Sequence, residues 1–248
     1  MVRTFATHKI RKTQEISSCL WDFCTLPEQG KEEAVKGKAA VPGGWESCPD
    51  TRTYRGRACY ERDISCSGNV RIEFKGVSHT AQVYLDGREI ASHYNAYTPF
   101  SAVVKGLGGG KHHLKVIADN SFGPQSALHV PNDYQSYGGI TRPVVLEELN
   151  DSYITGIHFT PVRKDGKWYS SVQGELQNIS DHFFRGKVIL YLGEQEIHSA
   201  VVEAGPDSKA AFTAENLPCG QAEEWSPENP VLYLSLIHIS EPTRPISI

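Results

Sequence analysis

The sequence lacks the features that mark membrane proteins and nucleic-acid-binding proteins. No run approaches the roughly 20 apolar residues that a membrane-spanning helix needs. The N-terminal segment MVRTFATHKIRKTQEIS has no apolar stretch that could serve as a secretory signal. The formal net charge of the 248 residues is -4, so no basic field exists to attract nucleic acid or an anionic membrane. We therefore expect a soluble, cytoplasmic protein with neither kind of partner.

Signals for a metal site or a redox motif are also absent. None of the six cysteines forms a CxxC pair, and no pair of histidines completes a zinc pattern. His112 and His113 are adjacent, so on a strand their imidazoles would point to opposite faces, which is poor geometry for chelation. We expect reduced thiols, some buried as small apolar side chains, and no metal or cofactor.

The chain does contain a clear alternation of apolar and polar residues. Val70–Lys75 and Ala81–Leu85 both repeat with a period of two, which indicates strands with one buried face. Asp86-Gly87 and Asp165-Gly166 each separate two runs of this kind. Asp-Gly in that position is a strong hairpin signal, because both turn residues adopt positive φ.

Glycine and proline set the expected limits of other strands. The run Gly106–Gly110 predicts a loop between strands at Tyr97–Val104 and Leu114–Ala118. A strand that begins at Ile154 is expected to end at Pro161. Long helical periodicity is absent, and turns recur every 8–12 residues or so. This pattern favours an all-β chain that begins with a jelly-roll sandwich.

The polar segment Glu148–Ser152 divides this pattern in two. We expect a jelly roll over residues 1–149 and an immunoglobulin-like sandwich over residues 150–233. The second range is shorter than the roughly 100 residues that an immunoglobulin-like domain usually needs. We therefore expect that domain to be truncated, with an exposed sheet edge and low stability.

A series of short segments, in fixed order, carries a family resemblance. They are Leu20-Trp21-Asp22-Phe23, Val41-Pro42-Gly43-Gly44-Trp45, Gly56–Glu61, Val83–Gly87, Tyr97-Thr98-Pro99-Phe100, Asp119-Asn120, Tyr137–Arg142 (YGGITR) and Ser226–Tyr233 (SPENPVLY). Together they resemble family 2 glycoside hydrolases, the family of β-galactosidases, β-glucuronidases and β-mannosidases. The resemblance covers almost all of residues 1–233. It implies a galactose-binding-like jelly roll and an immunoglobulin-like domain of a retaining exo-β-glycosidase, acting on β-galactosides or β-glucuronides in carbohydrate metabolism.

The resemblance also implies that both catalytic carboxyls lie on a (β/α)₈ barrel that follows these domains. A barrel needs about 250 residues, and nothing after Tyr233 could supply one. We expect the chain to be inactive alone, with the missing barrel of the same polypeptide as its partner and a homo-oligomeric parent. Two acidic pairs are present, but Glu147 and Glu148 would face opposite sides of a strand, and Glu223-Glu224 lies in a loop-like stretch.

The resemblance points to four substrate-binding residues, Asp119, Asn120, Tyr137 and Arg142. Asp119 ends a strand, where side chains are presented to ligands, and an acidic residue at this motif reaches the sugar site in the β-galactosidases that the chain resembles. Asp119 and Asn120 also suit an Asx turn. Tyr137 could stack on a sugar ring. Arg142 could face the barrel or clamp a loop within the jelly roll.

Two further aromatic residues, Tyr134 and Trp45, are weaker candidates for stacking on a sugar, and we expect Trp45 to pack a loop. Two rival functions remain open. A free-standing carbohydrate-binding module would bind sugar without any hydrolase activity. A structural or adhesive protein of stacked sandwiches would carry an export signal and further repeats.

The segment from Leu234 onward, LSLIHISEPTRPISI, does not fit the domain pattern. Its string LSLIHISEPTR resembles the translation of a transposase adapter used in DNA library preparation. Pro242 and Pro245 are expected to prevent any continuation of the strand begun at Val231. We expect residues 234–248 to be an artefact rather than part of the domain, the alternative being a genuine polar tail.

Overall fold

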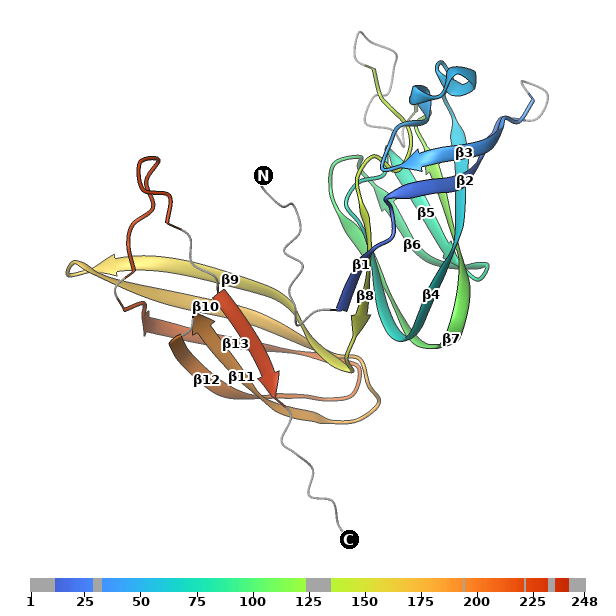
Figure 1. Cartoon of the computed structure of the whole chain (residues 1–248). Helices are drawn as coiled ribbons and strands as arrows, with labels where there is room; N and C mark the ends of the chain where they lie inside the picture. The colour runs from blue at the N-terminus through green and yellow to red at the C-terminus, as the bar shows by residue number, and fades with distance from the viewer. Residues whose placement is uncertain are drawn as a thin grey trace. The chain divides into compact units, whose positions relative to one another are not determined.

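A computed structural model describes residues 12–28, 33–123, 135–193, 195–220 and 222–231, and the backbone of residues 235–240. Contacts divide the chain into two units, Met1–Leu149 and Asn150–Ile248 (Figure 1). The only helices in the described ranges are two short 3₁₀ turns, η1 (Trp45–Ser47) and η2 (Pro49–Thr51). Neither of these short turns is long and apolar enough to cross a bilayer. The prediction of an all-β fold is confirmed.

Unit 1 is built on one large antiparallel sheet. Its strands are β1 (Lys12–Glu15), β2 (Cys19–Leu26), β3 (Lys36–Val41), β4 (Arg57–Phe74), β5 (Thr80–Leu85), β6 (Arg88–Tyr94), β7 (Phe100–Asp119) and β8 (Val144–Leu149). The order is β1-β8-β4-β7-β5-β6, and β2 joins by pairing with both β4 and β3. The long strands β4 and β7 run the length of the unit, with β2 and β3 at one end (Figure 1).

The core of unit 1 comes from the strand faces that the alternation predicted. Ile72 and Phe74 of β4 and Val83 of β5 are fully buried, and they belong to one apolar cluster. Across the sheet the same cluster takes in Leu114 and Val116 of β7. The hairpin between β5 and β6 turns at Asp86-Gly87 with φ of 50° and 81°, so the turn chemistry is as predicted.

Unit 2 is a sandwich of two three-stranded sheets. One sheet has the order β13-β10-β9 and the other has the order β12-β11-β14. The strands are β9 (Ser152–Lys164), β10 (Lys167–Asn178), β11 (Phe184–Leu192), β12 (Gln195–Ala204), β13 (Ser208–Pro218) and β14 (Ser235–Ser240). Leu176 and Phe212 from the first sheet pack with Val188, Leu190 and Val202 from the second. The immunoglobulin-like sandwich predicted after the jelly roll is therefore present.

The predicted loop at Gly106–Gly110 is wrong, because β7 continues through it. Gly106 and Gly110 adopt positive φ of 64° and 137°, and Gly68 on the facing strand does the same at 70°. The register between β4 and β7 shifts on both sides of Gly68. Bulges at glycines bend a strand without ending it. The glycines therefore allow two long strands to turn together.

Pro161 does not end its strand as predicted, since β9 runs on to Lys164 and Pro161 lies opposite Ser170. The reason is position in the sheet. Within the described residues β9 pairs with β10 alone, so it is an edge strand. An edge strand tolerates proline, because one side of its backbone makes no ladder hydrogen bonds.

Part of the segment that was expected to lie outside the domain, Ser235–Ser240, forms strand β14. β14 pairs with β11 in an antiparallel register from Ser235↔Leu192 to Ser240↔Lys187. The two prolines that were expected to prevent this, Pro242 and Pro245, lie outside the described residues. Both come after Ser240, so neither interrupts the six residues that pair.

Candidate functional site

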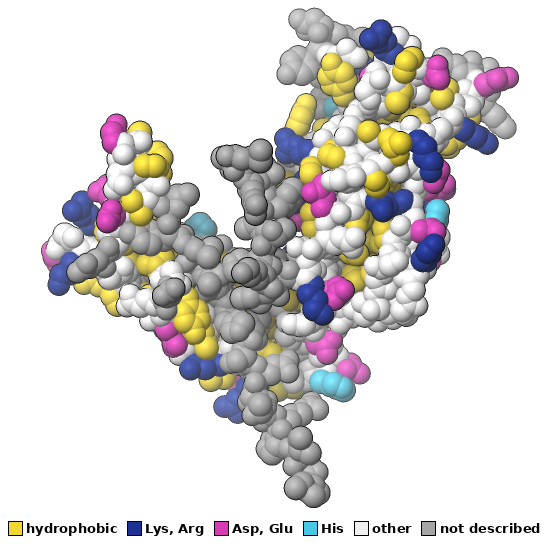
Figure 2. All heavy atoms as spheres, in the orientation of Figure 1, with side chains coloured by type: hydrophobic (Ala, Val, Ile, Leu, Met, Phe, Trp, Pro, Cys, Tyr) yellow, Lys and Arg dark blue, Asp and Glu magenta, His cyan; other side chains and the backbone are white. Residues whose placement is uncertain are grey.

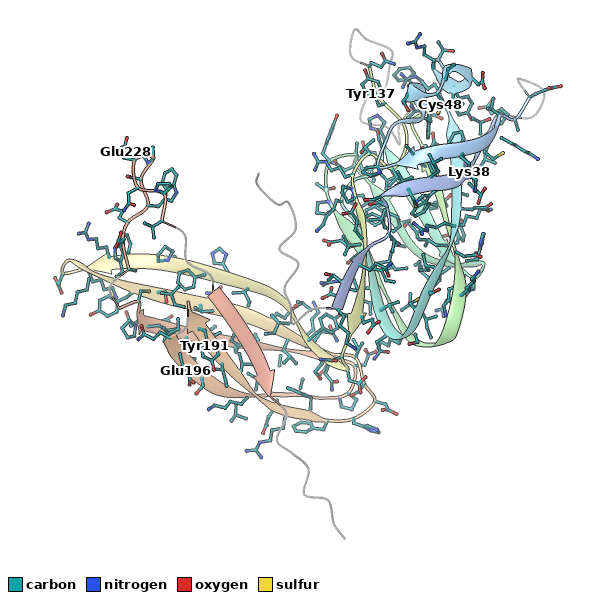
Figure 3. The ribbon with its side chains drawn as sticks, in the orientation of Figure 1. Lys38, Cys48, Tyr137, Tyr191, Glu196 and Glu228 are labelled. Carbon is teal, nitrogen blue, oxygen red and sulfur yellow. The ribbon has the colours of Figure 1, made fainter. Side chains whose placement is uncertain are left out.

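One end of unit 1 brings together three segments that are distant in sequence. Asn120, just after β7, donates its backbone N–H to the Gly56 carbonyl at 3.1 Å. Trp45 of η1 donates its backbone N–H to the Gly138 carbonyl at 3.0 Å. Tyr137 and Cys48 mark this end in Figure 3. The segments 44–57, 119–123 and 135–140 therefore form a single polar end of the jelly roll, which we call the 119–140 end.

Asn120 holds this end together from inside. Its side chain is 1% exposed. The amide nitrogen donates to Glu46 Oε1 at 3.2 Å and to the Ser136 carbonyl at 3.1 Å. The amide oxygen accepts from the Gly56 N–H at 2.9 Å. Both amide protons are thus used within the protein, so Asn120 shapes the site rather than offering a free donor to a ligand.

Glu46 is a half-buried carboxylate in the same network. Its Oε1 also accepts the Gly138 N–H at 2.8 Å, while its Oε2 is buried without a hydrogen-bond partner. Burial raises the pKa of this carboxyl, and the nearby Arg55 guanidinium opposes that rise. A buried carboxylate oxygen without a partner can still accept a hydrogen bond from a buried water, but it lies out of reach of a ligand at the surface.

Arg55 supplies positive charge beside these groups. Its Nη1 donates to the Asn120 carbonyl at 3.1 Å, and its guanidinium lies 4.1 Å from the centroid of the Phe122 ring. Stacking of this kind holds the planar guanidinium in place while leaving its edge available to acceptors. The arrangement can recognise an oxygen-rich or anionic group.

His79 lies beneath the turn that follows β7. Its backbone N–H donates to the Asp119 carbonyl at 2.7 Å. The side chain is 4% exposed, and neither ring nitrogen has a hydrogen-bond partner. Burial, helped by the charge of Arg55, lowers the pKa of the imidazole, so the ring is held neutral.

Asp119 forms the Asx turn that its sequence context allowed. Its Oδ1 accepts the Ser121 N–H at 2.8 Å. The residue is half-buried, so the carboxylate keeps some access to solvent. The turn role and a contact with a ligand are therefore compatible at this position.

Of the two aromatic candidates that the structure describes, Tyr137 is the one open to solvent, with 56% of its surface exposed. Trp45 is 1% exposed, donates its Nε1–H to the Tyr54 carbonyl at 3.1 Å and packs a loop, as expected. A Cβ at Gly138 would collide with the Trp45 ring, so the backbone lies directly against the indole. Tyr134 lies outside the described residues.

Arg142 belongs to a neighbouring loop rather than to the Asn120 network. Its Nη1 donates to the Tyr97 carbonyl at 3.3 Å. Its aliphatic stem packs over Gly76, where an added Cβ would lie 3.0 Å from Arg142 Cδ. These contacts are those of a clamp within the jelly roll, one of the two roles that the sequence left open.

Comparisons with known proteins identify the family. A scan against protein-family models finds no match. A curated β-galactosidase of Thermoanaerobacterium thermosulfurigenes is 32% identical over 119 residues, covering 44% of this chain and 16% of that protein. The crystal structure of a family 2 β-galacturonidase from Eisenbergiella tayi, bound to galacturonate, is 52% identical, with a TM-score of 0.90 over 97% of this chain and 43% of that chain. This chain belongs to glycoside hydrolase family 2.

The fold extends to more distant relatives. The crystal structure of a Bacteroides uniformis β-glucuronidase superimposes with a TM-score of 0.78 at 19% identity, a likeness of fold alone. The present family 2 chain spans 43% of the β-galacturonidase chain and 16% of the curated β-galactosidase. Its relatives are glycoside hydrolases, and the chain corresponds to part of their length.

The two acidic pairs of this family 2 chain are Glu147-Glu148 and Glu223-Glu224. The glutamates of the first pair point to opposite faces of β8, and Glu224 of the second pair forms an ion pair with an arginine. Glu147 is buried against Arg71, whereas Glu148 lies on the other face of β8 and pairs with Lys12 at 3.2 Å. Glu224 lies 3.3 Å from Arg163 on the surface. On the face shown in Figure 2, acidic and basic side chains are interspersed over both units.

The adjacent histidines also make separate contacts. His112 Nδ1 lies 2.7 Å from Asp86 Oδ2, and its Nε2 lies 2.9 Å from the Gly108 carbonyl. His113 Nδ1 lies 3.3 Å from Asp63. Within the described ranges, no group of three or more potential ligands gathers to hold a metal ion.

Sequence reasoning missed Glu46, Arg55 and His79. Glu46 directly follows the VPGGW segment, and its place next to that motif was the one available signal. The role of His79 had no local signal, because its backbone is held by distant residues. Its N–H donates to the Asp119 carbonyl, and its carbonyl accepts the Asn95 N–H at 3.0 Å.

Proposed function

We propose that this chain is the non-catalytic, sugar-recognising part of a retaining exo-β-glycosidase that removes terminal β-linked sugars. Residues 1–149 would form one wall of the sugar site and residues 150–233 would support the catalytic domain. The observation that carries the proposal is 52% identity over 97% of the chain with a β-galacturonidase solved with galacturonate bound. Family 2 enzymes place both catalytic carboxyls on a barrel, which is why the chain alone is expected to be inactive.

The chemistry of the 119–140 end supports sugar recognition. Tyr137 offers an exposed aromatic face, and the half-buried Asp119 carries a carboxylate that can accept hydrogen bonds from sugar hydroxyls. Arg55 adds a stacked cation that suits a carboxylate. An acidic sugar such as a β-galacturonide is therefore the first substrate class to test.

The direct test uses the purified chain with 4-nitrophenyl β-galacturonide, β-glucuronide and β-galactoside. We expect no release of nitrophenol above the uncatalysed background. Turnover that follows the chain through purification would overturn the proposal. Saturable binding of galacturonate by the chain, without turnover, would favour a free-standing carbohydrate-binding module instead.

A chimera tests the recognition role. Residues 12–231 would replace the matching part of the E. tayi β-galacturonidase, and the chimera should hydrolyse 4-nitrophenyl β-galacturonide. Tyr137→Ala in the chimera should raise KM by about 3- to 10-fold, the range for loss of one aromatic contact, with kcat nearly unchanged. Phe183→Ala is the matched control, because this residue is a 61% exposed aromatic of unit 2. Equal KM values for the two variants would contradict the role of Tyr137.

A further inference from the structure

Two cysteines lie directly opposite each other on neighbouring strands of unit 1. Cys24 of β2 is the register partner of Cys59 of β4. The register runs without a shift from Asp22↔Glu61 to Leu26↔Arg57, so the two residues form a regular cross-strand pair. Directly opposite residues of an antiparallel pair place their side chains on the same face of the sheet.

The face that these cysteines share is the outer one. The next pair along the ladder, Phe23 and Tyr60, packs in the core with ring centroids 5.1 Å apart. Because side chains alternate along a strand, Cys24 and Cys59 project away from that core. Cys59 is 6% exposed, while Cys24 is half-buried and within reach of solvent.

The distances of such a pair fit a disulfide. Opposite residues in an antiparallel ladder have Cα atoms about 4.5–5.5 Å apart, within the roughly 4.4–6.8 Å range of disulfides. Their Cβ atoms are about 4.5–5.5 Å apart, so bond formation requires the strands to close by up to about 1 Å. Both thiols are free in this structure.

We propose that Cys24 and Cys59 form a cross-strand disulfide when the protein meets a small-molecule disulfide such as oxidised glutathione. The Cys24 thiolate attacks the reagent, forming a mixed disulfide and releasing one thiolate. Cys59 then loses its proton to solvent and attacks Cys24 Sγ, releasing the second thiol. Two protein S–H groups and one R–S–S–R thus become one protein S–S bond and two R–SH. The two electrons pass from the cysteines to the reagent.

The surroundings assign the order of these steps. Burial, followed by the negative charge of Glu61, raises the pKa of the Cys59 thiol to about 12. A thiol attacks only as its thiolate, so Cys59 reacts slowly and second, after the more exposed Cys24. The mixed disulfide at Cys24 should therefore be seen before the protein disulfide.

The bond would tie the β2–β3 ribbon to the main sheet. These strands lead directly into the loop that carries Trp45 and Glu46, so oxidation acts next to the 119–140 end. A disulfide of this loop length should raise the Tm of unit 1 by an amount on the order of 5 °C.

The experiment equilibrates the native chain with oxidised glutathione and maps its cysteine peptides by mass spectrometry. We expect one linked peptide pair joining Cys24 to Cys59, while the exposed Cys19 takes up glutathione without forming a protein disulfide. Cys59→Ala should stop at one glutathione on Cys24. Cys66→Ser is the matched control, because Gly110 lies opposite that position, and it should oxidise like the wild type.

The wild-type map decides the question even if a variant folds poorly. Glutathione retained on Cys24 with no linked peptide at equilibrium would overturn the proposal. So would a linked peptide that joins any other two cysteines, or an unchanged count of reactive thiols. Reduction of the linked species should restore both thiols and the original Tm.

Discussion

Replacing Asn120 by alanine tests whether one buried amide holds the 119–140 end together. The change removes three side-chain hydrogen bonds, to the Gly56 N–H, the Ser136 carbonyl and Glu46 Oε1. Asn120 is 1% exposed, so solvent water has little access to the three groups that its side chain contacts. Glu46 Oε1 keeps the hydrogen bond from the Gly138 N–H, so the Gly56 N–H and the Ser136 carbonyl are the groups that lose this partner, at a cost of about 1–3 kcal/mol each.

Partial relaxation and entry of a water molecule reduce the sum, so we expect a loss of about 2–4 kcal/mol in the free energy of unfolding of unit 1. The assay is equilibrium urea unfolding followed by tryptophan fluorescence, because Trp21 and Trp45 are both buried in this unit. Asp119→Asn is the matched control: the new side chain keeps an acceptor for the Ser121 N–H, and its effect should stay below about 0.5 kcal/mol. A loss below about 1 kcal/mol for Asn120→Ala would refute the reasoning.

Three further changes probe other contacts. Both nitrogens of His112 face acceptors, and its hydrogen bond to Asp86 raises the pKa of the imidazole and lowers that of the carboxyl. The stability that His112 contributes should be present below its unfolded pKa and lost as pH rises through the raised folded pKa. The stability that Asp86 contributes should be lost as pH falls through its lowered folded pKa. His112→Gln should therefore flatten the high-pH side of a curve of Tm against pH. Gly138→Ala should destabilise unit 1 by at least about 2 kcal/mol in urea unfolding, because the added Cβ meets the Trp45 ring. Glu147→Gln should cost about 3 kcal/mol in the same assay by leaving its partly buried partner Arg71 without a carboxylate, and a cost near zero would refute that.

Local turn chemistry explains why much of the fold could be predicted. Asp86-Gly87 and Asp165-Gly166 form hairpins wherever strands flank them, since the positive φ of both residues depends on the dipeptide alone. Glycine and proline within a strand are different, because their effect depends on the partner strand. Gly106–Gly110 continues as strand opposite Gly68, and Pro161 is accepted on an edge.

The site was harder to predict for a related reason. Asp119 and Tyr137 could be chosen from motifs, but their final roles depend on what lies across the sheet. The sequence predicted Asn120 to contact a ligand. Its side-chain amide is instead hydrogen-bonded to Gly56 and Glu46, which lie 64 and 74 positions away in the chain. Glu46 gains its unpartnered oxygen through the same long-range packing, which no local pattern records.

The position of β8 in the sheet has a consequence for how the protein is made. β8 lies between β1 and β4, and within the described residues β1 pairs with β8 alone. A ribosome adds about 5–20 residues per second, so β1 waits on the order of ten seconds for its partner to be synthesised. From its own synthesis until then, the part of β4 that pairs with β8 also keeps one edge open. The first strand of the chain therefore gains its partner only after the last strand of the same sheet has been synthesised.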